Sequence, residues 1–207
     1  IFILLIFISF NISAQIKVSG EFSTPAYVWI DNNGEGRNVY AYFRNEFFLN
    51  EIPRHADLKL YAKSNYNLFV NGKFINYGPV RSYPSQPYYD SINILPFLKK
   101  GKNIIAVKVL SNGMHTFQVP DGTGGFIAWG EFTDKSKKIS LDTPGNWICR
   151  KDKGYNQLAP RFSFAQPPVE IYNALLEPDS WLAHKIIESK WKTPARLSNQ
   201  NYFGELK

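Results

Sequence analysis

The side chains best suited to chemistry gather in one short stretch, between residues 77 and 90. They are Tyr77, Arg81, Tyr83, Tyr88, Tyr89 and Asp90. Aromatic rings present apolar faces on which sugar rings can lie, and charged groups beside them can hydrogen-bond hydroxyls. The composition therefore indicates a carbohydrate-binding rim. A simpler interpretation stays open for two members, with Tyr89 packing internally and Asp90 bonding its own turn, as Asp side chains often do.

A second candidate region is the glycine-rich loop over residues 111–125, which contains His115, Gln118 and Asp121. Long loops are either functional or simply mobile. We add His115 to the candidate carbohydrate-binding residues, on the expectation that this loop borders a ligand or docks on a neighbouring domain. An ordinary flexible loop is the alternative.

Other site chemistry has little support in the sequence. Cys149 is the only cysteine, so no internal disulfide can form, and its neighbours Trp147 and Ile148 favour a buried structural thiol. The three histidines are widely spaced and none supplies the partner of a cysteine nucleophile. Asp90 and Asp121 lack the ligand spacing of a calcium loop. We therefore expect no metal ligand, no cofactor and no catalytic residue.

The charge balance does not indicate a nucleic-acid partner. The chain has 24 Lys and Arg against 17 Asp and Glu, a net charge of +7. Its densest basic clusters, 99–102 and 135–138, fall where turns are expected, and charge costs least in solvated turns. The sequence contains no nucleic-acid-binding motif.

The elements that must position these residues are strands. Asn71-Gly72 separates two apolar and aromatic runs, and Asn-Gly is the strongest short hairpin signal because a type I′ turn needs positive φ at both positions. Further strands are expected at 27–30, 39–49, 58–62, 103–110, 126–132, 139–141 and 146–150. Short strands between Gly, Pro and Asn turns, with almost no helical period, predict an all-β fold. We expect an antiparallel β-sandwich of the jelly-roll, carbohydrate-binding-module-like type.

The ends of the chain differ in character. Residues 1–14 match the apolar region of a secretory signal whose start is truncated, and are too few to span a bilayer. We therefore expect a secreted or periplasmic bacterial protein without a stable membrane span. The sandwich is expected over 20–155, and a proline-marked linker over 156–168. Residues 169–207 are expected to begin a second, truncated β module.

An ordered set of short motifs resembles the N-terminal β-sandwich of bacterial α-L-rhamnosidases, glycoside hydrolase family 78. The set comprises Phe43-Arg44-x-Glu46-Phe47, Ala62-x-Ser64-x-Tyr66-x-Leu68-x-Val70-Asn71-Gly72-Lys73, Gly78-Pro79, Tyr89-Asp90, Leu98-x-x-Gly101-x-Asn103, Thr143-Pro144-Gly145-Asn146-Trp147, Val169-Glu170-Ile171-Tyr172-Asn173-Ala174 and Ser189-Lys190-Trp191. The chain departs from the family at Pro144 and Asn173, where Asp is usual. It also has Asn112-Gly113-Met114-His115 where many relatives carry a glycine and tryptophan motif.

The resemblance implies a parent enzyme that hydrolyses terminal α-L-rhamnose from plant or bacterial glycans. In that family an acid and a base carboxylate act with inversion, and both belong to a downstream helical barrel. This chain would then be a non-catalytic accessory domain whose partner is the downstream catalytic domain. Two alternatives remain open: the sugar-binding domain of a family 2-type β-glycosidase, and a stand-alone lectin-like module.

Overall fold

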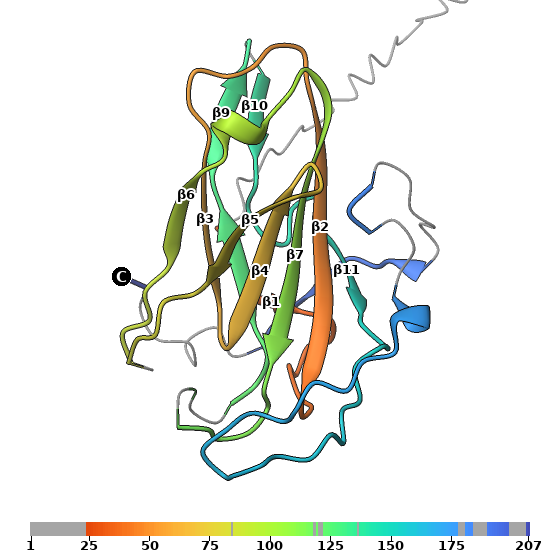
Figure 1. Ribbon diagram of the computed structural model, residues 1–207. Coiled ribbons are helices and arrows are strands. Elements are labelled where there is room, and N and C mark those ends of the chain that lie inside the picture. The colour runs from red at the N-terminus through yellow and green to blue at the C-terminus, as the bar shows by residue number, and fades with distance from the viewer. Residues whose placement is uncertain are drawn as a thin grey trace, which may run out of the picture.

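The computed structural model describes residues 24–83, 85–117, 119, 122–135, 137–177, 181–183, 190–198 and 206–207. These residues form two five-stranded sheets and one separate hairpin, and every strand pair is antiparallel (Figure 1). Sheet I has the order β12-β1-β8-β3-β6, formed by Ala195–Arg196, Val28–Trp29, Phe126–Trp129, Asp57–Ala62 and Asp90–Asn93. Sheet II has the order β11-β2-β7-β4-β5, formed by Ile148–Lys151, Val39–Leu49, Gly101–Ser111, Asn65–Val70 and Lys73–Gly78.

The strand order is that of a jelly roll. Strands 1, 8, 3 and 6 lie in one sheet and strands 2, 7, 4 and 5 in the other, so the chain crosses repeatedly between layers. β11 and β12 extend the two sheets, and β9 (Glu131–Asp134) pairs with β10 (Lys137–Ser140) as a hairpin at one end. Short 3-10 turns occur at η1 (Leu95–Phe97) and η2 (Ala174–Leu176). The predicted antiparallel sandwich is therefore confirmed.

The hairpin at Asn71-Gly72 forms as the sequence predicts. Asn71 has φ of 50° and Gly72 has φ of 82°, the two positive values that a type I′ turn requires. The Asn71 side chain then ties the turn to β7, because its Oδ1 accepts from Ile104 N at 3.0 Å and its Nδ2 donates to Asn103 Oδ1 at 2.9 Å. The turn therefore fixes both the β4–β5 register and the position of β4 on β7.

The core lies between the sheets and follows the period of two in each strand. In β3, Leu58 and Leu60 are fully buried while Lys59 is half-buried. The largest fully buried apolar side chains include Trp29, Phe43, Phe126, Phe132 and Trp147. Cys149 is buried among them, as expected, and burial raises the pKa of its thiol to about 12.

One expected strand differs from the structure. The strand expected at 126–132 is divided at Gly130 into β8 and β9. The chain changes partner at Gly130, because β8 pairs with β3 and β9 pairs with β10, and glycine permits the close approach to the Asp57 carbonyl there, where a Cβ would collide. Among the described residues from 190 to 198, β12 pairs with β1 and Lys192 bridges to Cys149, so this part of the chain lies against the sandwich. The division into a sandwich over 20–155, a linker and a second β module stays a prediction.

The signal segment expected over 1–14 lies outside the described residues. Within the described ranges, no helix has the length and apolar character needed to cross a membrane.

Candidate functional site

Strand β5 and the connection that follows it carry four exposed members of the predicted rim. β5 is the edge strand of sheet II and β6 that of sheet I, so residues 79–89 cross from one layer to the other along one side of the sandwich (Figure 1). Tyr77, Tyr83 and Tyr88 are 61%, 81% and 50% exposed, and Arg81 is exposed as well. Three aromatic rings and one guanidinium group are therefore open to solvent.

Asp90 has a structural partner, and it is a tyrosine rather than its own turn. Its carboxylate accepts a hydrogen bond from the hydroxyl of Tyr66, which is 1% exposed and also accepts from Asn76 Nδ2 at 2.9 Å. Burial, and then the bond to Asp90, raise the pKa of Tyr66 well above its usual value. Gly78 leaves room for this contact, because a Cβ there would overlap both partners. Asp90 thus links β6 of sheet I to β4 of sheet II.

Tyr89 packs against a residue that the sequence analysis did not select. Its ring meets Trp129 edge to face, with centroids 4.8 Å apart, and Lys59 Nζ lies 5.7 Å from the Tyr89 centroid. All three residues are half-buried on the outer side of sheet I. The alternation of Phe126 and Ala128 with their neighbours would have indicated that Trp129 points away from the core.

His115 belongs to a different neighbourhood. It is exposed, and its carbonyl accepts from Arg161 Nη1 at 3.0 Å. Across the described part of the chain, no polar or ring contact joins His115 to the tyrosines of the 79–89 connection. Tyr77, Arg81, Tyr83 and Tyr88 are thus exposed, Tyr89 and Asp90 have internal partners, and no polar or ring contact between described residues brings His115 to them.

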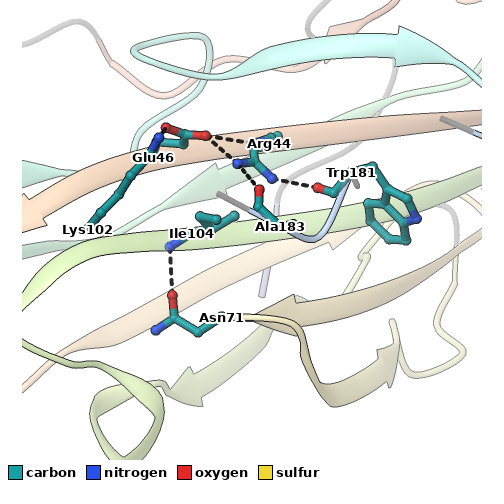
Figure 2. A network of polar contacts seen from close by, with 7 residues as sticks. All are labelled: Arg44, Glu46, Asn71, Lys102, Ile104, Trp181 and Ala183. Carbon is teal, nitrogen blue, oxygen red and sulfur yellow. Dashed lines mark hydrogen bonds and ion pairs between the residues drawn. The ribbon is translucent and has the colours of Figure 1, made fainter. Parts of the chain in front are cut away.

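A second polar cluster, which the sequence analysis missed, lies on the outer face of sheet II (Figure 2). Arg44 on β2 has a fully buried side chain and donates to the carbonyls of Trp181 and Ala183, both at 2.6 Å. It also pairs with Glu46, which pairs in turn with Lys102. Partial burial opposes ionisation of Glu46, but the hydrogen bonds from Lys102 and Arg44 outweigh it and lower its pKa. Arg44 therefore holds residues 181–183 on the sheet.

Next to Arg44, a cluster of aromatic and charged side chains attaches Asp152, Tyr155 and Tyr172 to the same outer face of sheet II. Tyr42 Oη donates to Asp152 Oδ2 at 2.5 Å. Lys108 Nζ lies 3.8 Å from Asp152 Oδ2, and 5.5, 4.8 and 5.2 Å from the ring centroids of Tyr42, Tyr155 and Tyr172. Burial first, and then the bond to Asp152, raise the pKa of Tyr42 well above its usual value. Tyr42, Lys108 and Asp152 satisfy one another, which is typical of a structural network.

A polar hollow of about 440 Å³ lies between the end of β2 and the β9–β10 turn. Its lining residues are Glu51, Ile52, Pro53, Arg54, His55, Thr133, Asp134 and Lys135. Asp134 joins its two walls by accepting from Asn50 N and Nδ2, both at 2.8 Å, and from Glu51 N at 3.1 Å. The backbone hydrogen bond from Asn50 is the main cause that lowers the pKa of Asp134. The carboxylate of Asp134 is committed to these bonds.

The described ranges contain no group of side chains arranged for metal ligation or for catalysis by a pair of carboxylates. No group of three or more His, Cys, Asp or Glu residues there could hold a metal ion. Asp121, the other acid weighed for calcium, lies outside the described residues. Glu46 and Asp90 are held on different sheets, one by Arg44 and Lys102 and the other by Tyr66.

Comparison with solved structures identifies similar folds. The chain is 29% identical to a glycoside hydrolase family 78 rhamnosidase from Bacillus sp. GL1, with a TM-score of 0.74 over 89% of this chain and 19% of that one. An α-L-rhamnosidase from Aspergillus terreus gives 18% identity and a TM-score of 0.66, covering 84% of this chain and 21% of that one. A Pleurotus ostreatus lectin solved with GalNAc gives 18% identity and a TM-score of 0.53, covering 85% of this chain and 42% of that one. No protein-family model and no curated protein sequence matches the chain.

This chain has the fold of a segment of family 78 rhamnosidases. The resemblance inferred from its ordered motifs is confirmed by the structural match. The chain spans about a fifth of the length of the rhamnosidases that it matches. The likeness to the lectin, at 18% identity, shows a shared fold alone.

Proposed function

We propose that this chain is a non-catalytic accessory domain of a secreted α-L-rhamnosidase-like glycoside hydrolase that acts on rhamnose-containing glycans. The observation that carries the proposal is the 29% identity and TM-score of 0.74 to the Bacillus rhamnosidase over 89% of the chain. In this proposal the domain braces the catalytic module and presents a weak sugar-binding rim.

The ion pairs of Glu46 and the hydrogen bond of Asp90 support a non-catalytic role. An inverting glycosidase needs an acid and a base roughly 6.5–9.5 Å apart across a sugar site, with one carboxyl group poised to donate a proton. Glu46 is instead ionised between two cations, and Asp90 accepts from a buried hydroxyl. These carboxylates stabilise the fold, and the proposal assigns hydrolysis to the rest of the parent protein.

The sugar-binding rim is proposed to consist of Tyr77, Arg81, Tyr83 and Tyr88. Exposed rings beside a guanidinium group provide stacking faces and directional donors for hydroxyls. Tyr77 is held in β5, and Tyr83 and Tyr88 lie on a connection whose ends are fixed by β5 and β6, so that less conformational entropy is lost on binding than in a free loop.

Calorimetric titration with L-rhamnose and rhamnosylated oligosaccharides tests the rim. We expect weak binding that is lost in the Tyr83→Ala, Tyr88→Ala double variant. The matched control is Leu158→Ala, since Leu158 is 83% exposed on another part of the molecule. Heat within noise at millimolar sugar would remove the rim from the proposal while leaving the domain assignment in place.

The coding sequence beyond codon 207 tests the domain assignment against the two alternatives. We expect it to encode a long helical barrel. A TIM-barrel pattern would favour the family 2-type β-glycosidase instead, and a stop codon close to codon 207 would favour the stand-alone lectin-like module.

A further inference from the structure

Residues 154–173, which include the linker expected over 156–168, fold back as a hairpin. A β-bridge between Tyr155 and Tyr172 joins its two arms. Three backbone hydrogen bonds of 2.8–2.9 Å reinforce the bridge: Asn173 N to Gly154 O, Asn156 N to Ile171 O, and Val169 N to Pro160 O. In Figure 1 the hairpin, in blue, lies at the end of the sandwich opposite β9 and β10.

The sandwich holds this hairpin in place along its whole length. At its base, Tyr155 stacks on Tyr40 with centroids 3.5 Å apart. Further along, Arg37 Nη2 donates to Ala159 O at 2.9 Å. At its tip, Phe117 N from the loop after β7 donates to the carbonyl of Ala165 at 2.9 Å. A segment with this many anchors has a defined surface.

That defined surface is apolar and open to solvent. Phe117, Phe162 and Phe164 are 81%, 90% and 82% exposed. The contacts of Ala165 with Phe117, and of Arg161 with His115 and Phe164, bring residues 115–117 beside residues 161–165. Three phenylalanines at this exposure present roughly 500 Å², which is comparable to the largest patch on a typical monomer. Singly exposed apolar residues need no explanation, but a preorganised group of this size marks an interaction site. We call these three residues the phenylalanine patch.

Two observations indicate which partner fits the phenylalanine patch: the positive charge near it and the length of the rhamnosidases that match this chain. Arg37 and Arg161 lie in the hairpin's anchoring contacts, and the chain carries a net charge of +7. Because Arg161 contacts the backbone of Phe164, a second copy of the chain would bring two arginines together at the patch, which disfavours self-association. The rhamnosidases that match this chain have about four-fifths of their length outside the matched part. Aromatic residues with arginine are also the composition enriched at buried interface centres.

We infer that the phenylalanine patch is the surface on which the hydrolase module of the same polypeptide docks. This inference rests on the proposed function and adds the place of contact. The module is expected to offer an apolar recess with acidic residues at its rim. Docking would bury the patch and leave the tyrosines of the 79–89 connection free.

Hydroxyl-radical footprinting of the product of the complete reading frame tests this inference without any substitution. Phe162 and Phe164 are measured against Tyr83, which is 81% exposed on the side of the sandwich and serves as the internal control. We expect a severalfold loss of labelling at the two phenylalanines, relative to the intrinsic reactivity of Phe, and full labelling at Tyr83. We then repeat the measurement on diluted protein and determine its mass by light scattering, which distinguishes a contact within one polypeptide from a contact with a second copy.

The outcomes separate this inference from the proposed function. Protection that persists in a monomer supports docking within one polypeptide. Full labelling of both phenylalanines in a preparation that releases L-rhamnose overturns the docking surface and leaves the proposed function standing. Protection that disappears on dilution of a dimer overturns it in favour of a second copy. A complete product that releases no rhamnose overturns the proposed function, and the inference falls with it.

Discussion

Replacing Arg44 by methionine removes the contact that holds residues 181–183 on sheet II. Methionine keeps most of the apolar stem, so the packing against the sheet is largely retained. What is lost is the guanidinium group that donates to the carbonyls of Trp181 and Ala183 at 2.6 Å and pairs with Glu46 (Figure 2).

The expected cost follows from these contacts. Each hydrogen bond from a charged donor contributes about 1.5–3 kcal/mol, and breaking a buried ion pair costs about 3–5 kcal/mol. Glu46 keeps Lys102 as a partner and its side chain is 28% exposed, so the remaining charge is not stranded. We therefore expect the lower end, a loss of about 3 kcal/mol in the free energy of unfolding.

Urea unfolding of the wild type and of Arg44→Met at pH 7, followed by circular dichroism, measures this loss. Lys102→Met is the matched control, because Lys102 is 44% exposed on the other side of Glu46, and an exposed pair contributes less than about 1 kcal/mol. A loss in Arg44→Met no larger than in Lys102→Met would refute the reasoning that Arg44 holds this segment.

The pH dependence gives a second readout of the same contact. The pKa of Glu46 is lowered from its ordinary 4.5 in the folded protein, so its contribution is present above that value and is lost as pH falls through the folded pKa. Wild-type stability should therefore fall below pH 4.5, and Arg44→Met should show a shallower fall. Equal slopes in the two proteins would contradict the assignment.

Three further predictions concern the β4–β5 turn and the interior of the sandwich. Asn71→Ala puts alanine at φ of 50°, a conformation that alanine adopts less readily than asparagine. It also removes the side-chain bonds to Ile104 N and Asn103 Oδ1. Its urea midpoint should report a loss of about 3 kcal/mol, and a loss under about 1 kcal/mol would contradict the role of the turn. Tyr66→Phe withdraws the donor from Asp90 and should cost about 1–2 kcal/mol in thermal unfolding, so an unchanged midpoint would show that this bond contributes nothing. Cys149, with its thiol pKa raised to about 12, is neutral and buried at pH 8, and should react with a disulfide reagent only after denaturation; rapid reaction of the native protein would argue against its burial.

The fold was predictable where the signals are local. Asn71-Gly72 specifies its turn through backbone conformation alone, and 39–49 carries enough β-branched and aromatic residues to define β2 with the bounds observed. The jelly-roll arrangement followed from many short strands between turns, because few other architectures accommodate them.

The parts that were not predictable depend on contacts distant in sequence. β12 joins β1 across more than 160 residues, and no local pattern in Ala195–Arg196 announces it. Arg44 has the polar character of an exposed strand residue, and its burial depends on carbonyls about 140 residues later. The proline-rich 156–168 segment has the composition of a linker. Its fixed position was not predictable, because the bonds that hold it come from Arg37, Asn38 and the loop after β7.

The candidate rim was predictable only as a collection of residue types. The sequence placed its tyrosines in one connection, but the partners of Tyr89 and Asp90 come from β8 and β4, which the strand register alone brings near. Whether the exposed tyrosines bind sugar stays a prediction.

The most direct test of the account is the release of L-rhamnose from an α-L-rhamnoside, measured side by side for the product of the complete reading frame and for residues 1–207. The account predicts release by the complete product, with inversion at the anomeric carbon, and none by residues 1–207. Release by residues 1–207 alone, or activity of the complete product on a β-glycoside instead, would contradict it.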